Sequence, residues 1–261
     1  MGADADMDTG ATVGLPFEPI RTERLLLRPM RESDADAFFE RRNHPDVARY
    51  QTWTLPYPRE RAERVVASVI EMGRPVADDT WMLTVADLDD TEVYGDLVLE
   101  LKWGTRTAEI GYTLHPRWWA RGFALEASEA LVAYAFETLD VTRVQGMLHP
   151  DNHASAMVLE RLGLIFEGHT RSSFWVGDEC SDDWIYGMTR ADWDAWRTRA
   201  RTRPELVELV ELESDTVVDA AKLVTHKSQE RFVAPVLYSL AQALVPEVDE
   251  GVAVVPWYRG I

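Results

Sequence analysis

A short turn between a strand-like run and a helix-like run constrains the fold of this chain more than any other feature. Residues 107–114 read as a strand that Pro116 ends, and residues 124–138 place apolar side chains at helical spacing. The turn between them reads Arg117-Trp118-Trp119-Ala120-Arg121-Gly122-Phe123-Ala124. The start of such a helix gathers free backbone N–H groups and the positive end of the helix dipole. We therefore expect an anion such as a pyrophosphate to bind there, where Gly122 allows close approach.

Strand and helix signals alternate along the first 190 residues or so. We expect strands at 22–29, 80–86, 92–101, 107–114, 144–148, 164–176 and 183–188. We expect helices at 34–42, 59–72, 124–138 and 152–162. Ser33 and Asn152 are the expected N-caps of the first and last of these helices. This order predicts an α/β (α+β) fold with a mixed central sheet of about six to seven strands flanked by helices.

Changes in composition divide the chain into four segments. The segments are an expected disordered tail at 1–15, a main domain at 16–197, a basic linker at 198–205 and a second module at 206–261. The second module is predicted to contain a strand at 206–212, a helix through Lys222, a helix at 233–244 and a strand at 252–258. Because the main domain begins with the same order of elements, we expect this module to be an incomplete copy. Its unpaired strand would then be an interface, which would allow a homodimer.

Charge and cysteine content exclude several classes of protein. The formal net charge of −18, from 27 Lys and Arg against 45 Asp and Glu, argues against nucleic-acid binding. The single cysteine, Cys180, excludes an intrachain disulfide, and the six histidines lack ligand spacing, so we expect no metal site. Residues 1–13 do not resemble a secretory signal, and no stretch approaches the roughly 20 apolar residues of a membrane span. We therefore expect a cytoplasmic protein without a membrane partner.

The turn resembles the acetyl-coenzyme A signature of the GNAT superfamily of N-acetyltransferases, which reads [Gln/Arg]-x-x-Gly-x-Gly-x-[Gly/Ala]. Arg117 takes the first position, Gly122 the second glycine and Ala124 the small last residue. Ala120 stands where the first glycine is expected. If that position is left-handed, alanine costs on the order of 1 kcal/mol, whereas in a helical conformation the cost is negligible.

Further phrases are similar to the ribosomal-protein-alanine acetyltransferase branch of this superfamily, the RimJ/RimL type. They lie at 20–29, 108–112, 122–127, 152–164 and 183–193, the last resembling the closing strand of the branch. The resemblance spans residues 17–196 in family order. It implies the GNAT fold, acyltransferase activity and acetyl-coenzyme A as the acyl donor. Residues 229–235 and 256–260 resemble the opening of a different acetyltransferase branch, so the second module would be a partial GNAT-like module without a cofactor turn.

The resemblance also implies which residues carry the chemistry. Glu109, in the Ala-Glu-Ile-Gly-Tyr phrase, is the expected base, with Glu100 on the preceding strand as its rival. Ser155 is the expected proton donor to the departing thiolate. Some family members use a tyrosine where this chain has Leu159, so the identity of the acid stays open.

The cofactor contacts are implied in the same way. The pantetheine arm is expected to lie along Thr113, Leu114 and His115, with one backbone N–H polarising the thioester carbonyl. The complete set of expected cofactor-binding residues is Thr113, Leu114, His115, Arg117, Trp119, Ala120, Arg121, Gly122, Phe123, Ala124 and Asn152.

The expected reaction is direct acetyl transfer to a primary amine, which is either a protein N-terminus or a small molecule. The loop at 50–58 and the turn at 174–182 are expected to choose the acceptor. The alternative is a non-catalytic coenzyme A-binding or interaction protein derived from the same fold.

Overall fold

The computed structural model of the chain describes residues 17–200, 210–213, 216–243, 248–249, 252–253 and 259–260. Its described residues belong to two units, with the boundary between Arg197 and Thr198. Several expected segments lie outside the described residues: the tail at 1–15, residues 201–205 of the linker, and residues 206–209 and 254–258 of the two strands expected in the second module.

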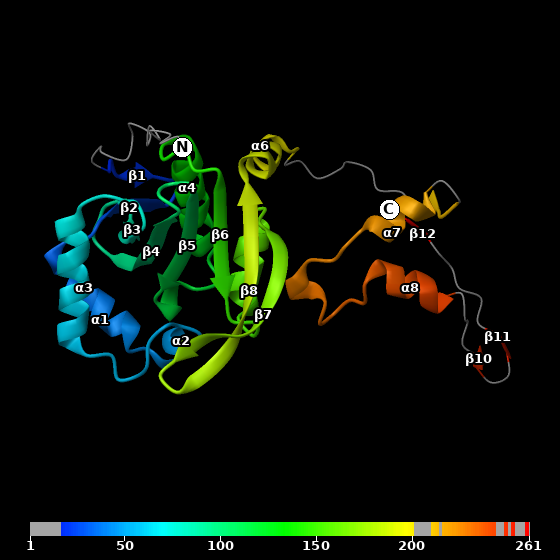
Figure 1. Cartoon of the computed structure of the whole chain (residues 1–261), viewed down its shortest axis with the longest axis horizontal. Helices are drawn as coiled ribbons and strands as arrows, with labels where there is room; N and C mark the ends of the chain where they lie inside the picture. Colours follow the sequence, from blue (N-terminus) through cyan, green and yellow to red (C-terminus); the bar gives the residue numbers. More distant parts are fainter. Residues whose placement is uncertain are drawn as a thin grey trace, which may run out of the picture. The chain divides into compact units, whose positions relative to one another are not determined.

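A mixed sheet forms the centre of the first unit (Figure 1). Among the described residues its eight strands follow the spatial order β1-β2-β3-β4-β5-β6-β8-β7. They are β1 Ile20–Arg21, β2 Leu25–Pro29, β3 Thr80–Asp87, β4 Val93–Lys102, β5 Thr107–Leu114, β6 Arg143–Leu148, β7 Ile165–Val176 and β8 Glu179–Thr189. Neighbouring strands are antiparallel except for β5 and β6. The expected mixed α/β fold is confirmed, and the short strand β1 raises the count above the expected six to seven.

Each of the four expected helices of the first unit starts within one residue of its expected position, but the unit also contains short helices that were not expected. They are η1 Glu32–Asp34, α1 Ala35–Arg42, α2 Pro45–Ala48, α3 Arg59–Met72, η2 Pro116–Trp118, α4 Phe123–Glu137, α5 His153–Arg161 and α6 Arg190–Thr198. Ser33 is not an N-cap, because it lies inside the 3₁₀ turn η1. The closing strand ends at Thr189, and the chain then forms α6, whose start is marked by hydrogen bonds from Thr189 to Asp192.

One face of the sheet packs against η1 and α1. Thr84 of β3 donates to Asp34 of η1, and Asp96 of β4 pairs with Arg41 of α1. Thr84 is the cross-strand partner of Asp96, which in turn is the partner of Thr113 on β5. Because partners in register share a face and side chains alternate along a strand, Glu109 of β5 also lies on this face.

The other face packs against α4 and α5, which contact each other. The buried side of α4 presents Ala127 and Leu131 to the sheet. Leu159 of α5 packs on Gly146 of β6, where an added Cβ would lie 2.9 Å from a Leu159 methyl carbon. By alternation Tyr112 of β5 lies on this second face.

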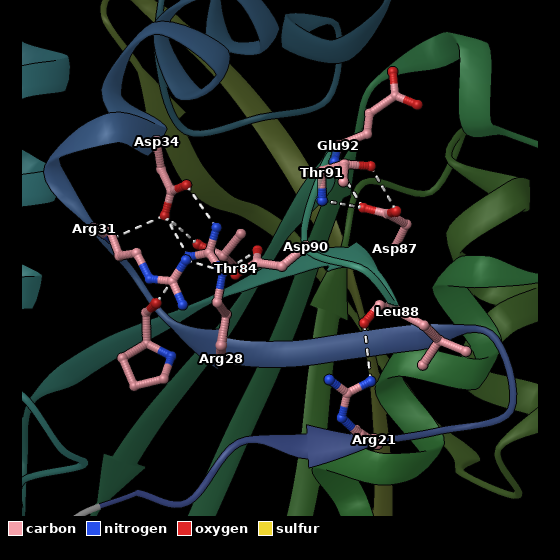
Figure 2. Close-up of polar contacts among 11 residues, drawn as sticks. Arg21, Arg28, Arg31, Asp34, Thr84, Asp87, Leu88, Asp90, Thr91 and Glu92 are labelled. Atoms are coloured by element: carbon pink, nitrogen blue, oxygen red, sulfur yellow. Dashed lines mark hydrogen bonds and ion pairs between the residues drawn. The ribbon is translucent and has the colours of Figure 1, made fainter.

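A buried ion-pair network joins the start of the sheet to η1 (Figure 2). Arg28 of β2 donates from two nitrogens to Asp34, at 2.8 and 2.9 Å, and from Nε to Asp90 at 2.6 Å. Asp34 also accepts hydrogen bonds from Thr84 and from the backbone N–H of Arg31. Burial raises the pKa of Asp34, but these hydrogen bonds and the Arg28 charge outweigh burial, so its pKa is lowered.

The turn between β5 and α4 contains two left-handed residues. Gly122 has a φ of 80° and is the N-cap of α4, and Ala120 has a φ of 57°. The first-glycine position of the signature is therefore left-handed, which is the case in which alanine is strained.

The second unit has short elements in its described residues. They are β9 Val210–Glu211, α7 Val217–Lys222, η3 Lys227–Gln229, α8 Val236–Ala243, β10 Val248–Asp249, β11 Val252–Ala253 and β12 Arg259–Gly260. β9 pairs with β12, and β10 pairs with β11. The helix expected from Val233 begins after Pro235. The idea of a partial module with a docking role stays a prediction.

Replacing Asp34 by Asn is expected to lower the free energy of unfolding by about 3 kcal/mol, because the buried Arg28 loses one of its two carboxylate partners and keeps only Asp90. The exposed pair of Asp36 with Arg59 provides the control, and Asp36→Asn should cost much less stability because solvent screens an exposed ion pair. Because the folded pKa of Asp34 is lowered, its contribution is complete above the unfolded value of about 3.9 and is lost as the pH falls through the folded value. Urea unfolding measured from neutral to acidic pH should show that the difference in unfolding free energy between the wild type and Asp34→Asn becomes smaller in acid. A difference independent of pH would contradict this assignment.

Replacing Ala120 by Gly is expected to raise the free energy of unfolding by about 0.5–1 kcal/mol, because glycine removes the left-handed strain. Ala133, inside α4, is the matched control, since glycine there should lower stability by about 1 kcal/mol. Chemical denaturation of both variants measures the two signs. A loss of stability at both positions would show that Ala120 is not strained.

Candidate active site

The strands β5 and β6 separate partway along their length. They pair in parallel from Thr107 to Glu109, and the last rung joins Glu109 to Gln145. Beyond it β5 continues to Leu114 and β6 continues to Leu148, without further rungs between these two described strands. The separation leaves a gap that opens towards the turn leading into α4. Peptide groups on the edges of this gap are available to a ligand.

The direction of the peptide groups decides which of them face the gap. The N–H of His115 donates to the carbonyl of Tyr94 on the β4 side. Because successive residues of a strand direct their N–H and C=O groups to opposite sides, those of Leu114 and Tyr112 face the gap. The Leu114 carbonyl accepts a hydrogen bond from the indole of Trp119 at 2.8 Å, which leaves its N–H for a ligand. Three residues were expected along the pantetheine arm. The peptide groups of Leu114 face the gap, whereas those of Thr113 and His115 face β4.

The turn itself has the geometry of an anion site. Gly122 is the N-cap of the 15-residue helix α4 and has no side chain that could accept a hydrogen bond. The N–H groups of Phe123 and Ala124 in the first turn therefore have no side-chain cap. A Cβ added at Gly122 would lie 3.3 Å from a guanidinium nitrogen of Arg24. The left-handed backbone favours glycine here, and a Cβ would push the Arg24 guanidinium away by a few tenths of an ångström.

Arg24, for which the sequence analysis assigned no role, supports the turn from the position just before β2. Its guanidinium donates to the carbonyl of Arg121 at 2.9 Å, pairs with Glu126 at 2.6 Å and lies 4.6 Å from the ring centre of Phe123. Thr22 donates to the same Glu126 carboxylate. The carboxyl pKa of Glu126 is raised by burial but lowered more strongly by these hydrogen bonds and by Arg24. The sequence shows an arginine just before the first long strand. It does not predict that this arginine contacts a helix about 100 residues later.

The two arginines of the signature flank an aromatic stack. Trp118 stacks on Tyr94 with ring centres 4.1 Å apart, and the guanidinium groups of Arg117 and Arg121 lie 5.1 and 4.9 Å from the Trp118 ring. Arg117 also forms an ion pair with Glu92. Both cations are therefore held beside the turn, as an anion site requires.

The candidate base lies at the last rung before the strands separate. Both the ammonium of Lys102 and the amide of Gln145 donate to Oε2 of Glu109, at 2.8 and 2.7 Å. Its Oε1 accepts no hydrogen bond from the described residues and can take one from water. Burial lowers the pKa of Lys102, but its pairs with Glu109 and Glu100 outweigh burial and raise it. Glu100 lies on β4, one strand farther from the gap, so the geometry favours Glu109 as the group beside the gap.

The candidate acid lies on the opposite side of the gap. Asn152 caps α5 by accepting a hydrogen bond from the Ser155 N–H at 3.2 Å. The Ser155 hydroxyl lies 2.8 Å from the phenol oxygen of Tyr112, a residue to which the sequence assigned no role. Leu159 is buried against β6 and supplies no acid. Glu109 and Ser155 thus lie on opposite faces of the sheet, on either side of the gap.

The segments expected to choose the acceptor lie near each other. In Figure 1 the tip of the β7–β8 hairpin curls towards α2. A Cβ added at Gly177 of this tip would lie 3.8 Å from the methyl group of Thr54 in the loop after α2. The ring of Tyr50 stacks on that of His149, at the end of β6, with centres 5.2 Å apart. The loop therefore reaches both the hairpin and the end of a separated strand.

Two open hollows in the first unit lie outside the turn, and one of them adjoins Lys102, the partner of Glu109. One, of about 310 Å³, is lined by Asp78, Glu100 and Trp103, and the other, of about 490 Å³, lies between α3 and β3. Neither contains residues of the turn, so the backbone geometry, not cavity size, marks the candidate site. Within the described residues no group of His, Cys, Asp or Glu suits a metal ion. None of the described helices combines the length and apolar character needed to cross a membrane.

Comparisons with known proteins match the part of the chain that contains the turn. Residues 24–165 match the acetyltransferase (GNAT) domain family. The uncharacterized N-acetyltransferase YnaD of Bacillus subtilis is 26% identical over 67% of this chain and 99% of that protein. The ribosomal protein uS5-alanine N-acetyltransferase of Escherichia coli is 25% identical over 72% of this chain and 99% of that protein. The solved structure of RimL, a ribosomal L7/L12 alpha-N-protein acetyltransferase in complex with coenzyme A, has a TM-score of 0.58 at 21% identity, covering 66% and 98% of the two chains.

The family match includes the turn, the separated strands and α5, and it covers more than half of the chain. These comparisons confirm the resemblance of the main domain to the GNAT superfamily, whereas the resemblance noted for the second module stays a prediction. This chain is therefore an acyltransferase that belongs to the GNAT acetyltransferase family.

Proposed function

We propose that this protein transfers an acetyl group from acetyl-coenzyme A to a primary amine, in the gap between β5 and β6. The observation that carries the proposal is the combination of an uncapped helix start at Gly122 with peptide groups left unpaired beside it. A diphosphate can bind at the uncapped helix start. An extended arm that contains amides can form hydrogen bonds with the unpaired peptide groups. When bound, acetyl-coenzyme A supplies a thioester carbonyl that an amine attacks directly.

The residues around the gap fit the needs of this reaction. A free alkyl amine has a pKa of roughly 10 and must lose a proton, which Glu109 would take up through a water at its Oε1. The Leu114 N–H would polarise the thioester carbonyl. Ser155 would donate to the departing sulfur from the opposite face. Arg117, Arg121 and the α4 start would hold the phosphates, and Trp119 would keep the turn closed through Leu114.

The acceptor class is the finer part of the proposal. Relatives named for ribosomal proteins favour a protein N-terminus as the acceptor, whereas a small amine is the alternative. A peptide must enter from the face that carries Glu109, past the loop at 50–58 and the β7–β8 tip. The net charge of −18 suits a cationic amine of either kind.

Replacing Glu109 by Gln is expected to lower kcat about 100-fold while leaving the affinity for coenzyme A unchanged, because the change removes the base and keeps the side-chain shape. Glu100→Gln is the matched control, since it removes the neighbouring carboxylate that shares Lys102. Calorimetry with coenzyme A measures binding. Acetyl transfer to a peptide with a free N-terminal alanine, to the same peptide with a blocked N-terminus and to small alkyl amines measures turnover.

Equal losses in the two variants would remove Glu109 from its special role, and a larger loss in Glu100→Gln would assign the base to Glu100. Binding of coenzyme A without turnover on any amine would contradict the proposed function and favour the non-catalytic alternative.

A further inference from the structure

Two hydroxyl groups meet across the gap. Tyr112 extends from β5, and its phenol oxygen lies 2.8 Å from the Oγ of Ser155 and 2.9 Å from the carbonyl oxygen of the same residue. Ser155 lies in the first turn of α5, on the other side of the gap. The contact therefore joins the two walls of the proposed active site.

The hydrogen atoms of this pair have two arrangements. The phenol has one hydrogen, which it donates either to the Ser155 carbonyl or to the Ser155 Oγ. In the first arrangement the serine hydroxyl is left to donate back to the phenol. In the second arrangement the serine hydroxyl hydrogen is free for another acceptor. Burial raises the pKa of Tyr112, so the phenol keeps its hydrogen and remains a donor.

No other residue of α5 carries a hydroxyl group that could donate to a ligand in the gap. α5 reads HASAMVLER, in which Ser155 carries the single hydroxyl. Leu159, one turn later, is buried and packed against Gly146. The group that can orient the Ser155 hydroxyl from within the gap is therefore the phenol of Tyr112.

We propose that Tyr112 is a positioning residue that, by donating to the Ser155 Oγ, directs the serine hydroxyl hydrogen towards the sulfur that leaves coenzyme A. This inference rests on the proposed acetyl transfer. As the C–N bond forms, the C–S bond breaks and its electron pair stays on sulfur, where Ser155 donates a hydrogen bond. The proton that the amine releases, through Glu109 and water, converts the thiolate to the thiol, so no further reactant is needed.

The thiol of bound coenzyme A gives a test that does not depend on turnover, because a thiolate absorbs ultraviolet light more strongly than a thiol. Titration of this absorbance in the full chain measures the acid dissociation constant of the bound thiol, for which a free thiol has a pKa of about 8.5. We expect this constant to be about 10-fold larger in the wild-type complex than in free coenzyme A. Tyr112→Phe and Ser155→Ala should each return it towards the free value. Tyr134→Phe, which removes another partly buried phenol hydroxyl on α4, should leave it unchanged.

Kinetics separate a positioning role from a structural one. Tyr112→Phe should lower kcat about 10-fold without changing the KM for acetyl-coenzyme A, and the double variant with Ser155→Ala should be no slower than Ser155→Ala alone. A higher KM with unchanged kcat, additive losses in the double variant, or an unchanged thiol titration in Tyr112→Phe would overturn the inference. Should Tyr112→Phe unfold, the titration of Ser155→Ala decides, and an unchanged value there overturns the inference as well.

The two proposals fail in different ways. A chain that binds coenzyme A but acetylates no amine contradicts the proposed function, while the thiol titration still decides the role of Tyr112. A chain that acetylates amines with Tyr112→Phe as active as wild type contradicts the positioning role alone. A chain that does not bind coenzyme A contradicts both.

Discussion

The separation of β5 from β6 after the Glu109–Gln145 rung is the constraint on which the rest of the site depends. Two parallel strands that stay paired would satisfy their own peptide groups and leave nothing for a ligand. Because they separate, the peptide groups of Tyr112 and the N–H of Leu114 need another partner, while the Leu114 carbonyl accepts from Trp119. The crossover helix α4 begins at the open end of the same gap, so its positive end and the free peptide groups serve one extended ligand.

The sheet divides the chemistry between its two faces. Glu109 and its partners Lys102 and Gln145 lie on the face covered by η1 and α1, whose attachment depends on buried arginine–aspartate pairs. Tyr112 and Ser155 lie on the face covered by α4 and α5. An amine that arrives from one face and a thiolate that leaves on the other meet in the gap between them. The strained turn at Ala120 is tolerated because Arg24 and Trp119 hold both of its ends.

Local patterns in the sequence predicted most of the elements, since periodicity and end signals are properties of neighbouring residues. The strand Thr107–Leu114 and the helix Arg59–Met72 have the expected bounds, and Asn152 caps its helix as expected. The 3₁₀ turn around Ser33 and the helix α6 were missed, because their starts depend on the side chains of Asp34 and Asp192. Local patterns could not predict the long-range contacts of Tyr112 with Ser155 and of Arg24 with the turn. They also could not decide whether Ala120 has a left-handed backbone.

Amide hydrogen exchange at the gap, with and without coenzyme A, tests the central claim most directly. The N–H groups of Tyr112 and Leu114 face the gap, whereas that of Thr113 faces β4 and should exchange slowly in both states. The account predicts that coenzyme A slows exchange at Leu114 and Tyr112 and leaves Thr113 unchanged. Binding of coenzyme A that leaves exchange at Tyr112 and Leu114 unaltered would contradict the placement of the ligand between β5 and β6.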